Sequence, residues 1–462
     1  MRQTKIVATL GPKTEAPDVL RELLTAGVDV ARLNLSHVNL TELPTTCQRI
    51  REAAQAVDRQ VAILLDTQGP EVRLGDVREG ALSLRAGDGI WVQPGHGDVG
   101  DMTVGVSWPG VLGMLTVGDR VRVGDGLDEM RVTRCQEHCA YLEAVGDMVV
   151  QSHSKLSLPG RGWPLPILSE RDRQALTGGA LFDFVAVSLV RCAAHVQEVQ
   201  EFLRGSTAGI LAKIENREAV EHCRSIADTA NGIMVARGDL GVDCPWHEVP
   251  AMQKDIIWTA NAAGIPVITA TQMLESMVHE ASPTRAEATD VANAVWDGTD
   301  AVMLSEETAV GEHPVEAVRA MAEVILTAER HREYFHPLGA FPKTEGAVMA
   351  EAAVDIAANV AASAIVTPTQ TGRTARLVSR LRPEVPVIAL SAQATVLTQA
   401  ALWRGVIPTA FAAAPGPDTF GAAVEHIVAQ GVLKPGDRYV ITWGLHLGDA
   451  TNTVHLGTVP ER

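Results

Sequence analysis

The sequence is poor in cysteine and has no long apolar run, and each of these absences excludes a class of protein. Its 462 residues include six cysteines, which are scattered and do not form the dense framework of a disulfide-bonded scaffold. The N-terminal segment MRQTKIVATLGP lacks the apolar stretch of a signal peptide. No uninterrupted apolar run approaches the length that spans a membrane. We therefore expect a protein of the reducing cytoplasm that is not embedded in a membrane.

Positive charge is also scarce. The chain has 39 lysines and arginines against 56 aspartates and glutamates, which gives a formal net charge of −17. Such a charge repels nucleic acid and anionic membrane surfaces, so we expect neither as a partner. The sequence lacks the motif G-x-x-x-x-G-K-[ST], which excludes nucleotide binding by a P-loop. A phosphorylated ligand would have to be held by a few local basic groups or by a metal ion.

The sequence does contain a regular alternation of short β-branched runs with longer stretches of helical spacing. This alternation predicts an α/β fold with a parallel sheet. Eight runs have the character of strands, at residues 5–10, 29–35, 61–66, 183–189, 209–214, 232–237, 265–271 and 300–305. Eight strand–helix units predict a (β/α)8 TIM barrel, whose active site lies at the C-terminal ends of the strands.

The pattern is interrupted once and restarts once, which predicts three domains. Residues 74–155 lie between the third and fourth strands, are rich in Gly and Val, and predict an inserted small β-barrel lid domain over the barrel mouth. The catalytic barrel would then comprise residues 1–73 and 156–335. After a segment typical of a linker, FHPLGAFPKTEG, helices alternate with the runs SAIVTP, VPVIALS and RYVITW, which predict a C-terminal α/β domain over residues 336–462.

The segment GILAKIENR carries two charged residues at the end of the fifth predicted strand. Lys213 and Glu215 are two residues apart, so they face the same side, at the barrel mouth. The next strand ends in ARGDLG, which we expect to deliver Asp239 on a tight turn after Gly238. Two carboxylates on neighbouring strand ends suit a hard divalent cation such as Mg²⁺, with room for substrate and water. A Lys–Glu pair that merely ties the barrel together is the alternative, and the arrival of Asp239 favours a functional site.

Polar residues also gather at the ends of the second and third strands. Arg32, Asn34 and Ser36 share one face of RLNLSH, and His37 follows; a solvent-facing edge would also alternate in this way, but inner barrel strands are covered on both faces. The third strand ends in LLDTQGPEVR, which supplies Asp66, Thr67 and Arg73. Arginine suits phosphate. The neutral oxygens of Asn34, Ser36 and Thr67 with the single carboxylate of Asp66 would suit K⁺.

The last two strands end in hydroxyl groups. The seventh predicted strand ends at Thr271 in TATQM, and the eighth ends at Ser305 in MLSEETA. A single hydroxyl at such a position usually satisfies the backbone. Together with a metal and Lys213, these hydroxyls predict a proton relay.

At this point the sequence resembles a known family. The segments TKIVATLGP, RLNLSH, LLDTQGPEVR, KIEN, IMVARGDLGV, VITATQMLESM, PTRAEATDVANAVWDGTDAVMLSEETA and TGRTARLVSR occur in the order and spacing of pyruvate kinases. The resemblance runs from Thr4 to DATNTVHL near the C-terminus. It implies a pyruvate kinase of bacterial length, with no extra N-terminal domain and no appended C-terminal one.

The resemblance implies a reaction and roles for the residues. Pyruvate kinases transfer the phosphoryl group of phosphoenolpyruvate to ADP and then protonate the enolate to give pyruvate. Lys213 would steady the phosphoryl group, while Glu215 and Asp239 would hold Mg²⁺ or Mn²⁺. Arg32 would contact the phosphate. The backbone around Gly238 and Asp239, with Thr271, would contact the carboxylate, and Thr271 or Ser305 would belong to the route that protonates the enolate.

The resemblance also implies sites for K⁺ and nucleotide. The family's K⁺ ligands match Asn34, Ser36, Asp66 and Thr67. Its nucleotide contacts match Asn34, His37, Arg73 and Lys155, and a second Mg²⁺ would arrive on ADP. The family's assembly implies a homotetramer.

Several positions depart from the family pattern. Gln68 stands where many members have Lys, a change that accompanies independence of K⁺, although Thr67 and Glu71 match the K⁺-dependent type. Lys155 in SKLSLPG is displaced by one position. Glu306 replaces Gly in MLSGETA. Two other functions therefore stay open: a catalytically weak regulatory paralogue of pyruvate kinase, and another Mg-enolate TIM-barrel lyase.

A loop of the C-terminal domain predicts regulation. TPTQTGRTA follows a strand and opens a helix, where hydroxyls and backbone N–H groups form an anion site; a capped helix without a ligand is the alternative. The family uses this loop for a phosphorylated allosteric effector, a sugar phosphate or nucleotide. The matching residues are Thr369, Thr371, Gly372, Arg373 and Thr374.

Overall fold

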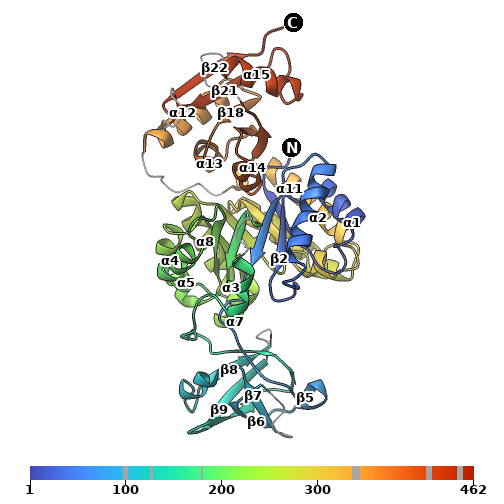
Figure 1. Cartoon of the computed structure of the whole chain (residues 1–462), viewed down its shortest axis with the longest axis vertical. Coiled ribbons are helices and arrows are strands. Elements are labelled where there is room, and N and C mark those ends of the chain that lie inside the picture. Colours follow the sequence, from blue (N-terminus) through green and yellow to red (C-terminus); the bar gives the residue numbers. More distant parts are fainter. Residues whose placement is uncertain are drawn as a thin grey trace.

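The computed structural model describes residues 1–96, 102–124, 128–177, 181–335, 344–412, 419–444 and 451–461. Three bodies lie in a row, with the central barrel between the C-terminal domain at one end and the inserted lid at the other (Figure 1). Over the described residues, no helix is both long enough and apolar enough to cross a membrane. The sheets follow the predicted order along the chain, while the exact domain boundaries stay predictions.

Eight parallel strands close the central barrel in the spatial order β1-β17-β16-β15-β14-β13-β3-β2. All eight predicted strands are confirmed, with bounds that differ by a few residues. They are β1 Lys5–Thr9, β2 Val30–Asn34, β3 Ala62–Asp66, β13 Phe184–Val187, β14 Gly209–Ile214, β15 Gly232–Ala236, β16 Val267–Ala270 and β17 Ala301–Leu304. The main helices around them are α1 Pro17–Ala26, α2 Leu43–Ala56, α3 Glu170–Leu176, α4 Ala193–Phe202, α5 Arg217–Glu221, α6 Cys223–Ala227, α8 Val249–Ala263, α9 Arg285–Trp296 and α11 Pro314–Arg330.

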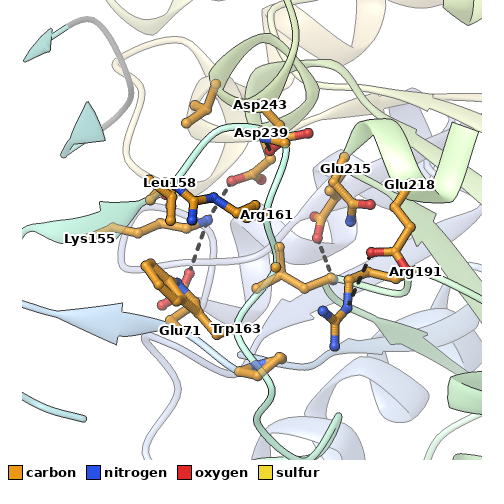
Figure 2. Close-up of a pocket in the computed structure, with 17 residues that line it drawn as sticks. Glu71, Lys155, Leu158, Arg161, Trp163, Arg191, Glu215, Glu218, Asp239 and Asp243 are labelled. Atoms are coloured by element: carbon orange, nitrogen blue, oxygen red, sulfur yellow. Dashed lines mark hydrogen bonds and ion pairs between the residues drawn. The ribbon is translucent and has the colours of Figure 1, made fainter. Parts of the chain in front are cut away.

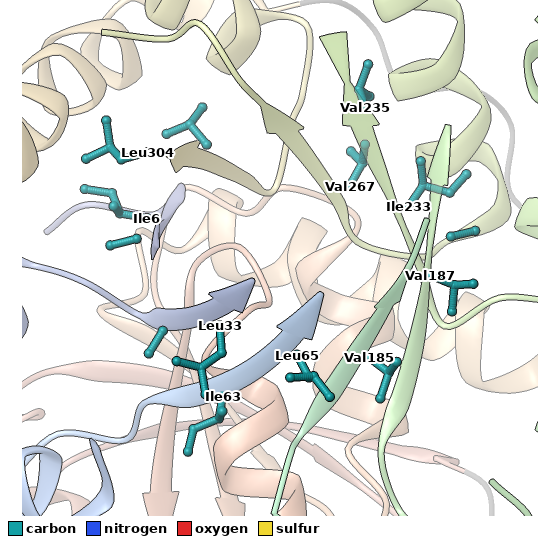
Figure 3. Close-up of a cluster of buried hydrophobic side chains, with 14 of the residues drawn as sticks. Ile6, Leu33, Ile63, Leu65, Val185, Val187, Ile233, Val235, Val267 and Leu304 are labelled. Carbon is teal, nitrogen blue, oxygen red and sulfur yellow. The ribbon is translucent and has the colours of Figure 1, made fainter. Parts of the chain in front are cut away.

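The two faces of each barrel strand have different surroundings. Ile210, Ala212 and Ile214 of β14 belong to the apolar layer between the strands and the outer helices, together with the side chains drawn in Figure 3. Leu211 belongs to the core inside the barrel. Because side chains alternate along a strand, Lys213 shares the inward face with Leu211. On β14, the inner face is therefore apolar at Leu211 and charged at Lys213, toward the mouth of the barrel.

The lid contains a seven-stranded sheet and a separate two-stranded ribbon. The order of the larger sheet is β4-β12-β8-β9-β10-β6-β7, and β5 pairs with β11 in the ribbon. The bounds are β4 Val72–Arg73, β5 Ala81–Leu84, β6 Gly89–Pro94, β7 Thr103–Val106, β8 Arg120–Val123, β9 Asp128–Gln136, β10 Cys139–Ala144, β11 Met148–Gln151 and β12 Lys155–Ser157. The two edges of the larger sheet meet through the Leu74–Val106 bridge, and the Ser107 N–H donates to the Arg73 carbonyl at 2.8 Å, so the sheet closes as the small barrel that we expected.

The C-terminal domain has a five-stranded sheet in the order β20-β19-β18-β21-β22, in which only the edge strand β22 is antiparallel to its neighbour. The strands are β18 Ala364–Pro368, β19 Val387–Ser391, β20 Val406–Ala410, β21 Arg438–Trp443 and β22 Thr453–Thr458. The helices are α12 Glu345–Asn359, α13 Arg373–Ser379, α14 Ala394–Ala400 and α15 Thr419–Ala429. The predicted strands are confirmed, and β20 and β22 were missed. Most of the predicted linker, residues 336–343, lies outside the described residues.

The C-terminal domain docks on the end of the barrel opposite the mouth. Lys5 Nζ donates a hydrogen bond to the Val406 carbonyl at 2.8 Å, and Arg382 Nη1 lies 2.5 Å from Asp300 Oδ1. Apolar side chains inside the barrel, such as Leu211, form one continuous cluster with residues of the C-terminal domain such as Ala350. The barrel bottom is therefore sealed by another domain of the same chain.

We expect the buried ammonium group of Lys5 to make stability rise with pH. Burial lowers the pKa of Lys5 from 10.5 to about 8. Between these two values the unfolded chain binds a proton that the folded chain has lost, so the free energy of unfolding increases as pH rises through this window. The shift corresponds to about 3 kcal/mol. Urea unfolding from pH 7.5 to 10.5 should show this gain for the wild type relative to Lys5→Met, and parallel pH profiles would contradict it.

Candidate active site

Lys213 lies at the centre of a buried group of charges at the barrel mouth. Its Nζ atom lies 2.7 Å from Glu215 Oε1 and 3.1 Å from Asp66 Oδ1. The carboxylate side chains are each 1% exposed, and that of Lys213 is 10% exposed. The structure thus brings Lys213 and Glu215 together, as their spacing predicts, and adds Asp66 from β3.

Arg32 on β2 extends the group of charges. Its Nε donates to Asp66 Oδ2 at 2.7 Å, and its Nη1 donates to Thr9 Oγ1 at 2.8 Å. Burial alone would raise the pKa of Asp66, but Lys213 and Arg32 outweigh it and lower that pKa below the usual range. Asp66 is therefore a carboxylate shared by two cations.

Asp239 does not lie on a tight turn, as we expected from the sequence. Strand β15 ends at Ala236, and α7 (Arg237–Asp243) begins at the next residue, so Gly238 and Asp239 lie in the first turn of a helix. Gly238 accordingly does not adopt a left-handed conformation. The helix start still delivers Asp239 to the mouth.

The lid contributes a third cation. Lys155 on β12 reaches between two carboxylates, with its Nζ 2.8 Å from Asp239 Oδ1 and 3.4 Å from Glu71 Oε1 (Figure 2). Arg73 also pairs with Glu71, at 2.6 Å between Nη2 and Oε2. The lid and the barrel are therefore joined by charges at the mouth itself.

These neighbours determine the ionisation states. Burial opposes the ionised form of Asp239, but the ammonium groups of Lys155 and Lys213 lower its pKa to about 2. Burial raises the pKa of Glu215, an effect that Lys213 opposes and Asp239 reinforces. Burial also disfavours the ammonium form of Lys213, but Asp66 and the other carboxylates raise its pKa above the usual value. Lys213 and Asp239 are thus both charged at neutral pH.

Thr271 and Gln272 form a strained turn after β16. Their φ angles are 69° and 54°, in the left-handed region, where each residue other than glycine costs roughly 1–3 kcal/mol. The Thr271 hydroxyl donates to the Ala270 carbonyl at 2.6 Å and accepts the Gly238 N–H at 2.8 Å. The strained turn therefore holds the Thr271 hydroxyl against the first turn of α7.

Ser305 follows β17, immediately before α10 (Glu306–Ala309). Its hydroxyl is buried and has no hydrogen-bond partner among the described residues, while its N–H donates to Glu307 Oε2 at 2.6 Å. Burial raises the pKa of Glu307. Glu306, one of the departures from the family pattern, is exposed at the rim. The Ser305 hydroxyl thus retains its capacity to bond a ligand.

Two cavities meet at these side chains. A cavity of about 1570 Å³ contains most of the predicted substrate and nucleotide residues in its lining, namely Arg32, Asn34, His37, Lys155, Gly238, Asp239, Thr271 and Ser305. A smaller cavity of about 80 Å³ lies on the other side of Asp239 and is also lined by Glu215 and Lys155 (Figure 2). The larger cavity has room for two substrates at once.

The predicted K⁺ ligands come from adjacent strand ends. Asn34 and Asp66 are register partners in β2 and β3. The Asn34 side-chain oxygen accepts the Ser36 N–H at 3.2 Å, and Thr67 Oγ1 accepts the Ser188 N–H at 3.0 Å. In the described part of the chain, no three His, Cys, Asp or Glu side chains form a group that could hold a metal. A divalent ion at Glu215 and Asp239 would need oxygen ligands beyond these two side chains.

Ser188 and Asp172 were missed by sequence reasoning. The Ser188 hydroxyl lies 2.7 Å from Lys213 Nζ and donates to the Thr67 carbonyl at 2.7 Å. Ser188 has the inward parity of Phe184 in its strand, and this signal could have found it. Asp172 of α3 accepts the N–H groups of Gln68 and Gly69 at 2.8 and 3.1 Å, and no local pattern predicts that contact.

Two family models match this chain. The pyruvate kinase barrel domain matches residues 1–318, and the pyruvate kinase alpha/beta domain matches residues 347–456. The chain belongs to the pyruvate kinase family. Among its relatives, the pyruvate kinase of Geobacillus stearothermophilus is 40% identical over 98% of this chain and 79% of the relative, and that of Staphylococcus aureus is 37% identical over 99% and 80%.

Structural comparison agrees. The crystal structure of a pyruvate kinase from Cryptosporidium parvum matches with a TM-score of 0.91 and 34% identity, over 99% of this chain and 96% of that one. Pyruvate kinase activity, with phosphoenolpyruvate and ADP as substrates, is therefore the function of this chain. The alternative of an unrelated barrel lyase is wrong.

The predicted effector loop of this pyruvate kinase lies between β18 and α13. Gly372 is left-handed (φ 76°), and a Cβ there would lie 2.2 Å from the Trp403 ring, so no other residue fits. The Gly372 N–H donates to Thr369 Oγ1 at 2.9 Å, and the Thr374 hydroxyl lies 2.6 Å from that of Thr451. Two of the three threonine hydroxyls therefore already have partners within the protein.

We expect Ser188→Ala to lower the kcat of this pyruvate kinase about 10- to 100-fold, because a hydrogen bond to a charged group is worth roughly 1.5–3 kcal/mol. The change removes the hydroxyl that positions Lys213 and leaves the strand intact. Steady-state kinetics with thermal melting would check it. The matched control is Ser225→Ala, which removes an exposed hydroxyl bonded to the His222 carbonyl at 2.9 Å. Equal kcat values for the two variants would contradict the prediction.

Proposed function

We propose that Lys213 is the catalytic cation of phosphoryl transfer in this pyruvate kinase, an ATP:pyruvate 2-O-phosphotransferase. The observation that carries the proposal is the position of its ammonium group, buried between Asp66 and Glu215 at the barrel mouth. Phosphoryl transfer depends on positioning and charge neutralisation more than on covalent help. A fixed ammonium at this place offsets the charge that develops on the moving group without reorganisation during the reaction.

Glu215 and Asp239 would hold Mg²⁺ or Mn²⁺. Glu215 Oε2 accepts the Leu189 N–H at 2.6 Å, and Oε1 lies 2.7 Å from Lys213 Nζ, so a metal ion would share Oε1 with Lys213. Asp239 faces the same space and is ionised. When bound, the metal would act as a Lewis acid on the substrate oxygens. Lys155 Nζ lies 2.8 Å from Asp239 Oδ1, so metal binding would weaken this ion pair.

The remaining substrate contacts follow from the cavity lining. Arg32, held by Asp66 and Thr9, would bond the phosphate, while Gly238, Asp239 and Thr271 would receive the carboxylate. ADP, with its own Mg²⁺, would lie toward Asn34 and His37, with Arg73 and Lys155 on the lid side. Neighbouring carboxylates preorganise both lid cations, since Lys155 and Arg73 share Glu71.

Thr271 and Ser305 would belong to the route that protonates the enolate. The Thr271 hydroxyl is fixed by the backbone, and the Ser305 hydroxyl has no partner within the described protein, so each can bond a substrate or a bridging water. Asn34, Ser36, Asp66 and Thr67 would hold K⁺ beside them. The Asp66 carboxylate is the only charged ligand in that set, as a monovalent cation requires.

The regulatory part of the proposal concerns the C-terminal domain. Thr369, Thr371, Gly372, Arg373 and Thr374 would receive a phosphorylated effector, a role supported by the left-handed turn at Gly372 that begins α13. We further propose a homotetramer in the cytoplasm, which size-exclusion chromatography with light scattering would check.

We expect Lys213→Met to abolish phosphoryl transfer, with a loss of about 10³-fold or more, because it removes a buried preorganised charge. Protonation of the pyruvate enolate should stay measurable, as exchange of the methyl protons of added pyruvate with solvent. A coupled assay with phosphoenolpyruvate, ADP and Mg²⁺ follows the first activity, and NMR in D₂O follows the second. Lys434→Met on the C-terminal domain is the control. Near-normal kinase activity in Lys213→Met would overturn the catalytic role of Lys213. A change in effector binding alone would not bear on that role.

We expect one of fructose 1,6-bisphosphate, ribose 5-phosphate, glucose 6-phosphate and AMP to sharpen the saturation curve for phosphoenolpyruvate. Arg373→Gln should abolish that response, since it removes the cation of the loop, whereas the exposed Arg438→Gln of the same domain should retain it. Initial rates at varied phosphoenolpyruvate would measure both. Absence of a response to all four compounds would reject the effector site.

A further inference from the structure

Arg237 lines the larger cavity and is not itself among the predicted ligands of substrate or metal. It is the first residue of α7, and its side chain is 10% exposed. Its guanidinium group turns toward the adjacent β16 and donates to the Thr271 carbonyl from Nη2 at 2.6 Å and from Nε at 3.2 Å. Nη2 also donates to the Gln272 carbonyl at 3.0 Å. One side chain thus holds the carbonyls of both left-handed residues.

The other side of the guanidinium group is anchored. Nη1 lies 2.8 Å and 2.6 Å from the two carboxylate oxygens of Asp290 on α9, and 3.3 Å from Gln253 Oε1 on α8. Arginine presents its donors in a rigid planar fork, so anchoring one edge orients the other. Arg237 therefore fixes the position of the Thr271–Gln272 turn relative to α9.

The contacts of Arg237 also link the two elements that carry catalytic groups. Its backbone begins the helix that bears Asp239, and its side chain grips the turn that bears Thr271. The Gly238 N–H joins the same two elements directly, because it donates to Thr271 Oγ1 at 2.8 Å. A threonine stays in the left-handed conformation only where several contacts hold it there. Here Arg237 supplies the contacts to the Thr271 and Gln272 carbonyls.

We propose that Arg237 is a positioning residue for the reaction, which acts by holding Thr271 in its left-handed conformation so that the hydroxyl faces the substrate. The proposal rests on the role proposed for Thr271 in enolate protonation. Without the guanidinium fork, the turn relaxes and the hydroxyl leaves its place, while Lys213 and Glu215 keep theirs. The loss should therefore appear in kcat and in proton exchange more than in the KM for ADP.

The test is a double-mutant cycle between Arg237→Lys and Thr271→Val. We expect Arg237→Lys to slow both kcat and methyl-proton exchange of pyruvate about 10- to 100-fold, the effect of misplacing a catalytic group by about 1 Å. In the Thr271→Val background the same change should cost less than about 2-fold, because the hydroxyl that it displaces is already absent. Coupled assays, NMR exchange and thermal melts would be measured for all four proteins.

The controls separate positioning from general stability. Arg382→Lys alters another buried arginine, which bonds Asp300 and the Gly298 carbonyl at the opposite end of the barrel. It should lower the melting temperature, and its effect on kcat should be the same in both Thr271 backgrounds. If Arg237→Lys does not fold, Asp290→Asn releases the anchored edge and should show the same coupling to Thr271 with a smaller loss.

The outcomes are distinct. Equal losses from Arg237→Lys in both backgrounds would overturn the positioning role while leaving that of Thr271 intact. Unchanged exchange in Thr271→Val would overturn the role proposed for Thr271 and, with it, this inference. Loss of exchange in Thr271→Val, combined with a vanishing effect of Arg237→Lys in that background, would support both.

Discussion

A buried ammonium group stays charged only when carboxylates surround it, and the mouth of this barrel is organised by that constraint. Lys213 recruits Glu215 from its own strand and Asp66 from β3. Asp66 in turn fixes Arg32 on β2. Each charged group is thus stabilised by an oppositely charged neighbour. The series of alternating charges continues to Asp239 and to Lys155 of the lid. The geometry of the site is therefore set by mutual neutralisation in a poorly solvated place.

The alternation of side chains along a strand made much of this site predictable. It placed Lys213 and Glu215 together, and the same parity would have found Ser188. It could not find Arg237, whose contacts depend on the left-handed turn that follows the adjacent strand β16. Nor could it find the partners of Lys155, because the approach of an inserted domain is decided by the whole lid and not by its local pattern. Local periodicity predicts which way a side chain points, and tertiary packing decides what it meets.

The fold divides in the same way. The eight barrel strands are buried on both faces and stand out as apolar runs. The missed strands β20 and β22 are the two edges of their sheet, and β20 contains Pro408, a residue that sheets tolerate at edges. The small barrel of the lid was predicted from its strand content, but the order of its strands was not, because that order depends on register between distant strands. Interior elements were therefore read correctly more often than peripheral ones.

The continuous apolar cluster between the barrel interior and the C-terminal domain has a consequence for how the chain can be divided. Leu211 inside the barrel and Ala350 of α12 belong to one core. Separating the two domains would expose apolar surface on both, so we expect neither domain to be stable by itself. The strand–helix pattern of the sequence changes between the two domains, but the apolar core continues across this boundary. Because this shared core is close-packed, a change of side-chain volume at the floor of the barrel would also disturb the packing of the C-terminal domain.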